Sequence, residues 1–209
     1  MSGSGSVSPT SPASSASTIA VTYTAPASSS DGTATVTASY RGLTAASSTI
    51  SYTGITLSLS PGSATVDADG QSTVGLTLTF RYTTGSTAIA SATATITKTG
   101  SGSVSPASAA SSASTIAATF TAPAASADGT TTVTAAYKGL SATSTITYKG
   151  ITFTLSPSTA TVDADGQSTA ALTLTFRYAS GGAISGATEP LPVTPTVALA
   201  LLIAVPPVV

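Results

Sequence analysis

Six basic and seven acidic side chains in 209 residues leave a net charge of −1, and the sequence contains no His, Cys or Trp. Without His and Cys, the usual zinc and copper ligands, the commonest general base and all thiol chemistry are excluded. With so few titratable groups, we expect no enzyme activity and no cofactor. Six scattered basic residues also cannot follow a phosphate backbone, so no nucleic-acid partner is expected.

The rest of the composition favours β structure. Hydrophobic residues make up 41% of the chain and recur at regular spacing, which argues against disorder. The β-branched residues Thr and Val are abundant, whereas the good helix formers Leu, Glu, Lys, Gln and Arg are scarce. We therefore expect strands and no helices.

The chain repeats itself with a period near 96 residues. VSP at 7–9 returns at 104–106, and LTLTFRY at 76–82 returns at 172–178, so the offset is 97 residues early in the chain and 96 later. This period is too long for a solenoid repeat and suits one small domain.

The repeat divides the chain into four segments. Residues 1–54 form an incomplete unit that holds the C-terminal strands, and residues 55–150 form a complete unit. Residues 151–187 form a second incomplete unit that holds the N-terminal strands, and residues 188–209 form an apolar tail that matches nothing upstream. The apolar run at 197–205 is much shorter than the ~20 residues of a spanning helix, so we expect no transmembrane span.

Within the complete unit, alternation of apolar and polar residues predicts about seven short strands. Leu76, Leu78, Phe80 and Tyr82, for example, fall on one face of a strand, and Thr77 falls on the other. The predicted strands, in chain order, are 55–59, 64–66, 76–82, 92–98, 116–120, 132–137 and 143–148. Short strands with one apolar face each predict an all-β fold, an antiparallel β-sandwich.

The order of the motifs resembles a known family. ITLSLSP, TVDADGQST, LTLTFRY, SGSVSP, TAP, DGTTTVTAAYKGL and STITY follow one another within one period, and the likeness covers residues 1 to about 187. This order resembles the bacterial immunoglobulin-like domains of group 1, which form the rods of invasin- and intimin-like adhesins. The resemblance implies tandem immunoglobulin-like units that space or present something at the bacterial cell surface or outside the cell. One departure is the end of LTLTFRY, where many members carry an Asp-containing turn.

The acidic residues raise the question of a calcium site. Asp67 and Asp69, with their copies Asp163 and Asp165, lie in D-x-D-G strings, which are typical of the start of a calcium loop. A third polar ligand before Gly and a later Glu are missing, so an Asp-Gly turn that begins a strand is the favoured interpretation. If calcium binds, another ligand must come from a neighbouring loop, such as one at a junction between units.

Three functions are consistent with this pattern. The favoured hypothesis is a non-catalytic stalk whose partners are neighbouring units of the same protein. The second is a filament subunit in which residues 1–54 of one copy and 151–187 of another complete a sandwich by strand exchange; together they lack only residues 92–97 of a full period. The third is a carbohydrate-binding module that uses Tyr82, although core packing of the tyrosine rings is favoured.

Overall fold

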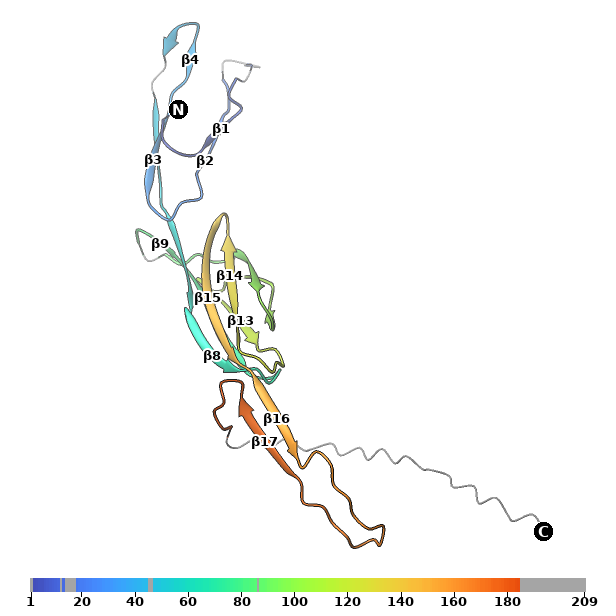
Figure 1. The fold of residues 1–209 in the computed structure, drawn as a ribbon. Coiled ribbons are helices and arrows are strands. Elements are labelled where there is room, and N and C mark those ends of the chain that lie inside the picture. Colours follow the sequence, from blue (N-terminus) through green and yellow to red (C-terminus); the bar gives the residue numbers. More distant parts are fainter. Residues whose placement is uncertain (1, 12, 14–17, 45–46, 86, 185–209) are drawn as a thin grey trace, which may run out of the picture.

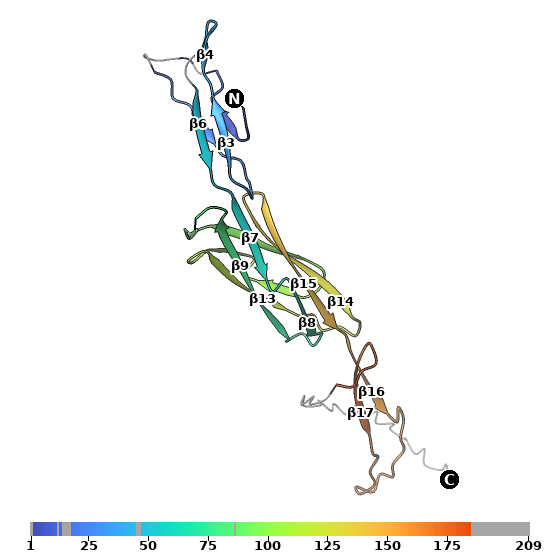
Figure 2. The ribbon, with the colours of Figure 1, turned by 90° about the vertical axis from the view of Figure 1, so that its left-hand side faces the viewer.

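The computed structural model describes residues 2–11, 13, 18–44, 47–85 and 87–184; the tail predicted at 188–209 lies outside the described residues. The described part contains strands and no helix, and therefore no helix long and apolar enough to cross a membrane. The molecule is elongated, with an N-terminal group of strands, a central sandwich and a C-terminal hairpin that follow one another along a line (Figures 1 and 2).

The central sandwich consists of two facing sheets. The four-stranded sheet has the order β11-β13-β9-β7, formed by Ser103–Ser105, Thr115–Thr121, Thr73–Tyr82 and Ile55–Ser60. The five-stranded sheet has the order β12-β10-β14-β15-β8, formed by Ser108–Ala110, Thr93–Thr99, Gly129–Tyr137, Leu140–Lys149 and Ser63–Asp67. These orders are those of the D-E-B-A and C-F-G strands of an immunoglobulin domain, with β12 and β8 added at the edges. The all-β, immunoglobulin-like sandwich predicted from the sequence is confirmed.

The structure differs from the predicted strands in two respects. It has two further three-residue strands, β11 and β12, which the alternation of apolar and polar residues does not single out. It also contains a parallel pair, β15 with β8, in which Tyr148 lies opposite Val66. Pro61, which has no N–H to donate, separates β7 from β8, and the chain passes there from one sheet to the other.

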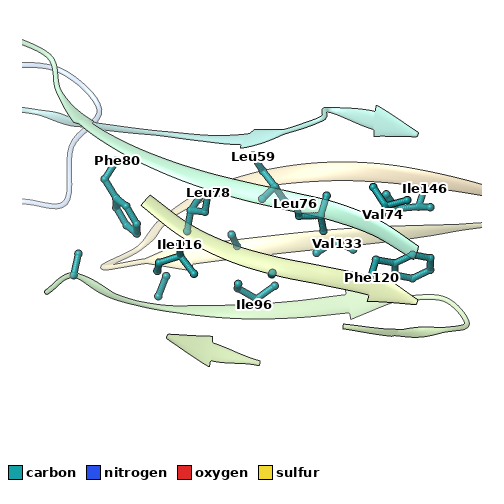
Figure 3. Packing of buried hydrophobic residues seen from close by; sticks show 14 of the residues in the cluster. Leu59, Val74, Leu76, Leu78, Phe80, Ile96, Ile116, Phe120, Val133 and Ile146 are labelled. Atoms are coloured by element: carbon teal, nitrogen blue, oxygen red, sulfur yellow. The ribbon is translucent and has the colours of Figure 1, made fainter. Parts of the chain in front are cut away.

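The core lies between the two sheets and is made by the predicted apolar faces. Leu76, Leu78 and Phe80 of β9 are 0–1% exposed, and they face Ile96 and Ile146 of the other sheet (Figure 3). Two buried hydroxyls each have a partner: Thr131 Oγ1 donates to the Ser101 carbonyl at 2.6 Å, and Ser144 Oγ donates to the Pro61 carbonyl at 2.7 Å. Hydrogen-bonded in this way, they avoid the cost of an unsatisfied polar group in the core.

The flanking segments form two-stranded sheets. At the N-terminal end, β1 pairs with β2, β3 with β6 and β4 with β5; their bounds are Ser6–Ser8, Thr22–Thr24, Gly32–Val36, Ser48–Tyr52, Ser39–Tyr40 and Leu43–Thr44. At the C-terminal end, β16 (Ile151–Ser156) pairs with β17 (Thr173–Tyr178). In these segments the apolar face is open: Leu172 is 56% exposed, whereas Leu76, at the same place in the repeat, is 1% exposed.

Candidate functional site

The candidate site lies at the junctions between units. The last strand of each unit runs almost directly into the first strand of the next. Only Thr53 and Gly54 separate β6 from β7, and only Gly150 separates β15 from β16. Both glycines are buried, and β16 leaves the central sandwich along the direction of β15 (Figure 1).

Three hydrogen bonds hold the second junction. The Gly150 N–H donates to Asp128 Oδ1 at 2.8 Å, and the Gly150 carbonyl accepts from the Ala179 N–H at 2.8 Å. The Ile151 N–H donates to the Ala125 carbonyl at 2.9 Å. The first bond fixes the end of the central unit, and the other two join residues of successive units, so they restrict how one unit can turn relative to the other.

The first junction repeats the same three bonds. The Gly54 N–H donates to Asp31 Oδ1 at 2.8 Å, the Thr83 N–H donates to the Gly54 carbonyl at 2.9 Å, and the Ile55 N–H donates to the Ser28 carbonyl at 2.8 Å. The two junctions therefore share one backbone geometry, although the side chains of Thr83 and Ala179 differ.

The close approach of two backbones explains the glycine at each junction. A Cβ atom on Gly150 would lie 2.4 Å from the carbonyl carbon of Ala127, and one on Gly54 would lie 2.5 Å from the backbone of Ser30. Real Cβ contacts are not that short, so any other residue would push the chain at the junction away from the loop that carries Asp31 or Asp128. The requirement at these positions is space rather than an unusual φ angle.

Side chains reinforce the two junctions in different ways. At the first, the hydroxyls of Thr83 and Thr84 donate to the two carboxylate oxygens of Asp31. At the second, the Tyr178 hydroxyl donates to Asp67 Oδ2 at 3.1 Å, and the Lys149 Nζ lies 5.2 Å from the centroid of the Tyr178 ring. Asp67 and Lys149 belong to the central sandwich and Tyr178 to the hairpin, so this cluster bridges two units. The Asp67 hydrogen bond also raises the pKa of Tyr178.

Asp31 is held in its ionised form. Hydrogen bonds from the Thr83 and Thr84 hydroxyls, followed by that from the Gly54 N–H, lower the pKa of Asp31. A carboxyl group whose pKa is lower in the folded state stabilises the fold above its unfolded pKa, and that contribution is lost as the pH falls through its folded pKa. The first junction therefore depends on an ionised Asp31.

We expect the Gly54 amide resonance to titrate in NMR with a midpoint below the usual aspartic acid pKa of about 3.9. Replacing both hydroxyl donors, in Thr83→Val with Thr84→Val, will raise this midpoint toward the usual value, because the first two causes of the lowered pKa are removed. Asp165→Asn, far from this junction, is the matched control and leaves the midpoint unchanged. A midpoint at or above the usual value in the parent protein contradicts the assignment.

Of the four carboxylates considered for calcium, three accept hydrogen bonds from other residues of the protein, and the fourth, Asp163, is exposed. Asp69 Oδ1 accepts from the Gln71 and Ser72 N–H groups at 2.8 and 2.6 Å, and Asp69 Oδ2 accepts from Ser72 Oγ at 2.8 Å. Asp165 makes the same three bonds, from Gln167 N–H and from both the N–H and Oγ of Ser168.

These bonds have an effect on the acidity of both carboxyl groups. At Asp69, desolvation acts to raise the pKa, but the hydrogen bonds from Ser72 and Gln71 outweigh it and the pKa is lowered. At Asp165, the hydrogen bonds from Ser168 lower the pKa. Asp67 contacts Tyr178, and Asp163 is exposed. Within the described part of the chain, no three acidic residues come together as a metal site would require. Calcium binding at these four residues stays the weaker alternative to an Asp-Gly turn.

Asp31 and Asp128 are the site residues that sequence reasoning missed. Each stands in an Asp-Gly pair, which by itself is typical of a turn, whereas each carboxylate accepts the N–H of a junction glycine. The signal was the spacing, since a glycine follows each Asp after nearly the same interval, at Gly54 and at Gly150. The sequence around each Asp does not by itself show that its carboxylate meets the distant glycine.

A pocket of 320 Å³ lies at one end of the central sandwich and includes Tyr82 in its lining. Thr79, Arg81 and Thr115 supply polar groups there, but the other aromatic residue of the lining, Phe80, is 0% exposed and belongs to the core. A sugar-binding surface usually offers an accessible aromatic face. The carbohydrate-binding hypothesis stays a prediction.

The strand order and facing sheets define an all-β protein of the immunoglobulin-like sandwich class. No protein-family model matches the chain, and no curated protein matches it. Among solved structures, the D00-D0 domain of intimin is 18% identical, with 69% of this chain and 77% of that chain covered and a TM-score of 0.35. Invasin, a bacterial integrin-binding protein, is 18% identical over 61% of this chain and 26% of its own, with a TM-score of 0.38. The S-layer protein rSbsC(31-844) is 16% identical over 81% and 22%, with a TM-score of 0.36.

Proposed function

We propose that this chain is part of a non-catalytic stalk that spaces or presents other domains of a bacterial adhesin, at the cell surface or outside the cell. The observation that carries the proposal is the junction: the same three hydrogen bonds and the same buried glycine occur at Gly54 and again at Gly150. A repeated junction geometry is what a rod of tandem units requires. The partners of each unit are then its neighbours in the same protein.

Physical arguments support a rod rather than a flexible string. A flexible linker lets the distance between domains grow only as the square root of its length. Here one or two residues connect strands of successive units, and hydrogen bonds on both sides of the glycine restrict rotation. The central unit also buries its own core, so added units extend reach without new chemistry.

The composition suits the same role. With six basic and seven acidic residues, the rod has few charges that salt can screen. The motif order that resembles group 1 bacterial immunoglobulin-like domains supports assignment to the invasin- and intimin-like adhesins, and we include that finer assignment in the proposal. Binding of a receptor would belong to another domain of such a protein.

A direct test is to insert one, two and three extra copies of residues 55–150 after Gly150 in the full chain. We expect the maximum dimension measured by small-angle X-ray scattering to rise by the same increment with each copy, because each junction sets the same geometry. The matched control is a four-residue linker of Gly and Ser inserted after each Gly150. This flexible linker will reduce the rise in maximum dimension per added copy.

Two results would contradict the proposal. The first is a maximum dimension that levels off as copies are added, with the same value in the parent and Gly-Ser series. The second is tight, saturable binding of a sugar or receptor protein to the unmodified chain, because a pure spacer has no ligand of its own.

A further inference from the structure

The two flanking segments each expose an apolar face that the central sandwich buries. In the N-terminal segment, Ile19 and Val21 are 50% and 49% exposed, whereas Ile116 and Ala118, at the same places in the repeat, are 3% and 5% exposed. In the C-terminal segment, Leu172 is 56% exposed. Open faces of this kind mark interaction surfaces.

The central sandwich shows what covers such faces. There β13 pairs with β9 in an antiparallel ladder that places Ile116 opposite Leu78 and Ala118 opposite Leu76. The N-terminal segment carries the repeat copy of β13, and β17 in the C-terminal segment is the copy of β9. Each segment therefore holds one side of the ladder that the other lacks.

We propose that the N-terminal segment of one copy of this chain pairs with the C-terminal segment of a second copy, head to tail, in the register of β13 with β9. That register places Val21 opposite Leu172 and Ile19 opposite Leu174, which are the repeat counterparts of the pairs in the central unit. The four-stranded sheet of a composite sandwich then has the order β1-β2-β17-β16.

The partner is a second molecule because one chain cannot make this contact with itself. The N-terminal strands and the hairpin β16–β17 lie at opposite ends of the elongated molecule, with the central sandwich between them (Figures 1 and 2). The backbone hydrogen bonds that cross the two junctions, such as those from the Ile55 N–H to the Ser28 carbonyl and from the Ile151 N–H to the Ala125 carbonyl, hold both segments in line with that sandwich. Pairing between molecules therefore makes an open-ended chain.

The second sheet of the composite sandwich can form in the same way. In the central unit, β8 adds in parallel to the edge of β15, with Val66 opposite Tyr148. The corresponding residues are Val162, which is 48% exposed and lies outside any strand, and Tyr52 at the end of β6. Association would therefore order the segment around Val162 into a strand at the edge of β6.

The composite sandwich lacks one strand. Of β10, which lies between β12 and β14 and contributes the buried side chains of Ala94 and Ile96, the flanking segments match only the end: Ser2 stands at the position of Thr99. Ser2 bridges Thr35 at one end of the edge of β3, the copy of β14, and the composite leaves the positions of Ala94 and Ile96 along that edge empty. A free peptide with the sequence of residues 92–97, ATATIT, is therefore expected to bind that edge and to strengthen the association.

Cysteine cross-linking of the full chain tests the register, because the natural sequence contains no Cys. We expect Val21→Cys with Leu172→Cys to give disulfide-linked dimers and longer ladders on non-reducing gels. The matched control is Val21→Cys with Leu155→Cys. Leu155 pairs with Leu174 on the next strand, one strand spacing farther from Val21, which is too far for a disulfide.

Sedimentation velocity over a range of concentrations tests the association itself. We expect concentration-dependent oligomers, an association constant reduced about tenfold or more by Leu172→Asp, and an increase of similar size with the peptide. Thr173→Asp is the control and has little effect, because its counterpart Thr77 faces away from the core and is exposed.

Several outcomes would overturn the proposal. One is a chain that stays monomeric at all concentrations, with and without the peptide. Another is equal cross-linking of the paired and control cysteines, which would indicate association without this register. A third is a Thr173→Asp variant that weakens association as much as Leu172→Asp does, which would also indicate association without this register.

Discussion

Leu76→Ala will lower the free energy of unfolding of the central sandwich by about 2–5 kcal/mol, whereas Leu172→Ala will change the stability of the protein by less than about 0.5 kcal/mol. Both leucines begin an identical LTLTFRY string. Leu76 is 1% exposed between two sheets, and Leu172 is 56% exposed on an uncovered hairpin. Truncation leaves a cavity only at the first position.

Unfolding in guanidinium chloride, followed by far-ultraviolet circular dichroism, gives both values. The measurement belongs at a protein concentration where sedimentation shows monomers, so that pairing between molecules does not protect Leu172. Amide hydrogen exchange at Val133 and Ile146 provides a second readout confined to the central core. Equal losses in the two variants would show that the hairpin face is covered in the monomer.

Gly150→Ala will break the second junction. The new Cβ would lie 2.4 Å from the backbone of Ala127, so the hairpin must move away and the bond from the Ile151 N–H to the Ala125 carbonyl is lost. We expect hydrogen-exchange protection of the Ile151 amide to fall about tenfold or more, which corresponds to the loss of at least one typical hydrogen bond. In solution scattering, the fixed maximum dimension will be replaced by a broader distribution.

Gly75→Ala is the matched control for this experiment. Gly75 lies within β9, a Cβ atom there would meet nothing within 4 Å, and its φ angle is not in the left-handed region. The change will leave protection at Ile151 and the scattering profile as they are in the parent protein. Unchanged protection at Ile151 in Gly150→Ala would mean that the junction tolerates a side chain and that its rigidity has another source.

Sequence reasoning succeeded where the determining interactions are local. The alternation of Leu76, Leu78 and Phe80 with polar residues predicted β9 and its buried face, because side-chain direction in a strand has a period of two. The Asp69 turn likewise forms the same three bonds as the Asp165 turn, although only the first belongs to a complete sandwich. Local chemistry is enough for both.

Sequence reasoning failed where the partner lies far along the chain. No local pattern shows that β8 pairs in parallel with β15, or that Asp31 accepts from an N–H 23 residues later. The general prediction that tyrosine rings pack in the core likewise gives no sign that the Tyr178 hydroxyl reaches Asp67, 111 residues earlier in sequence, across a junction. These contacts arise only when whole sheets and units have been placed against one another.

The sequence by itself therefore determined the strands, their apolar faces, the turns and the repeat, because each depends on residues a few positions apart. The tertiary structure decided which of those apolar faces is covered and how successive units are joined. Leu76 and Leu172 have the same neighbours in sequence, and only the presence of a facing sheet makes one of them core and the other surface. The hydrophobic effect acts on the area that is removed from water, and that area is a property of the assembled fold.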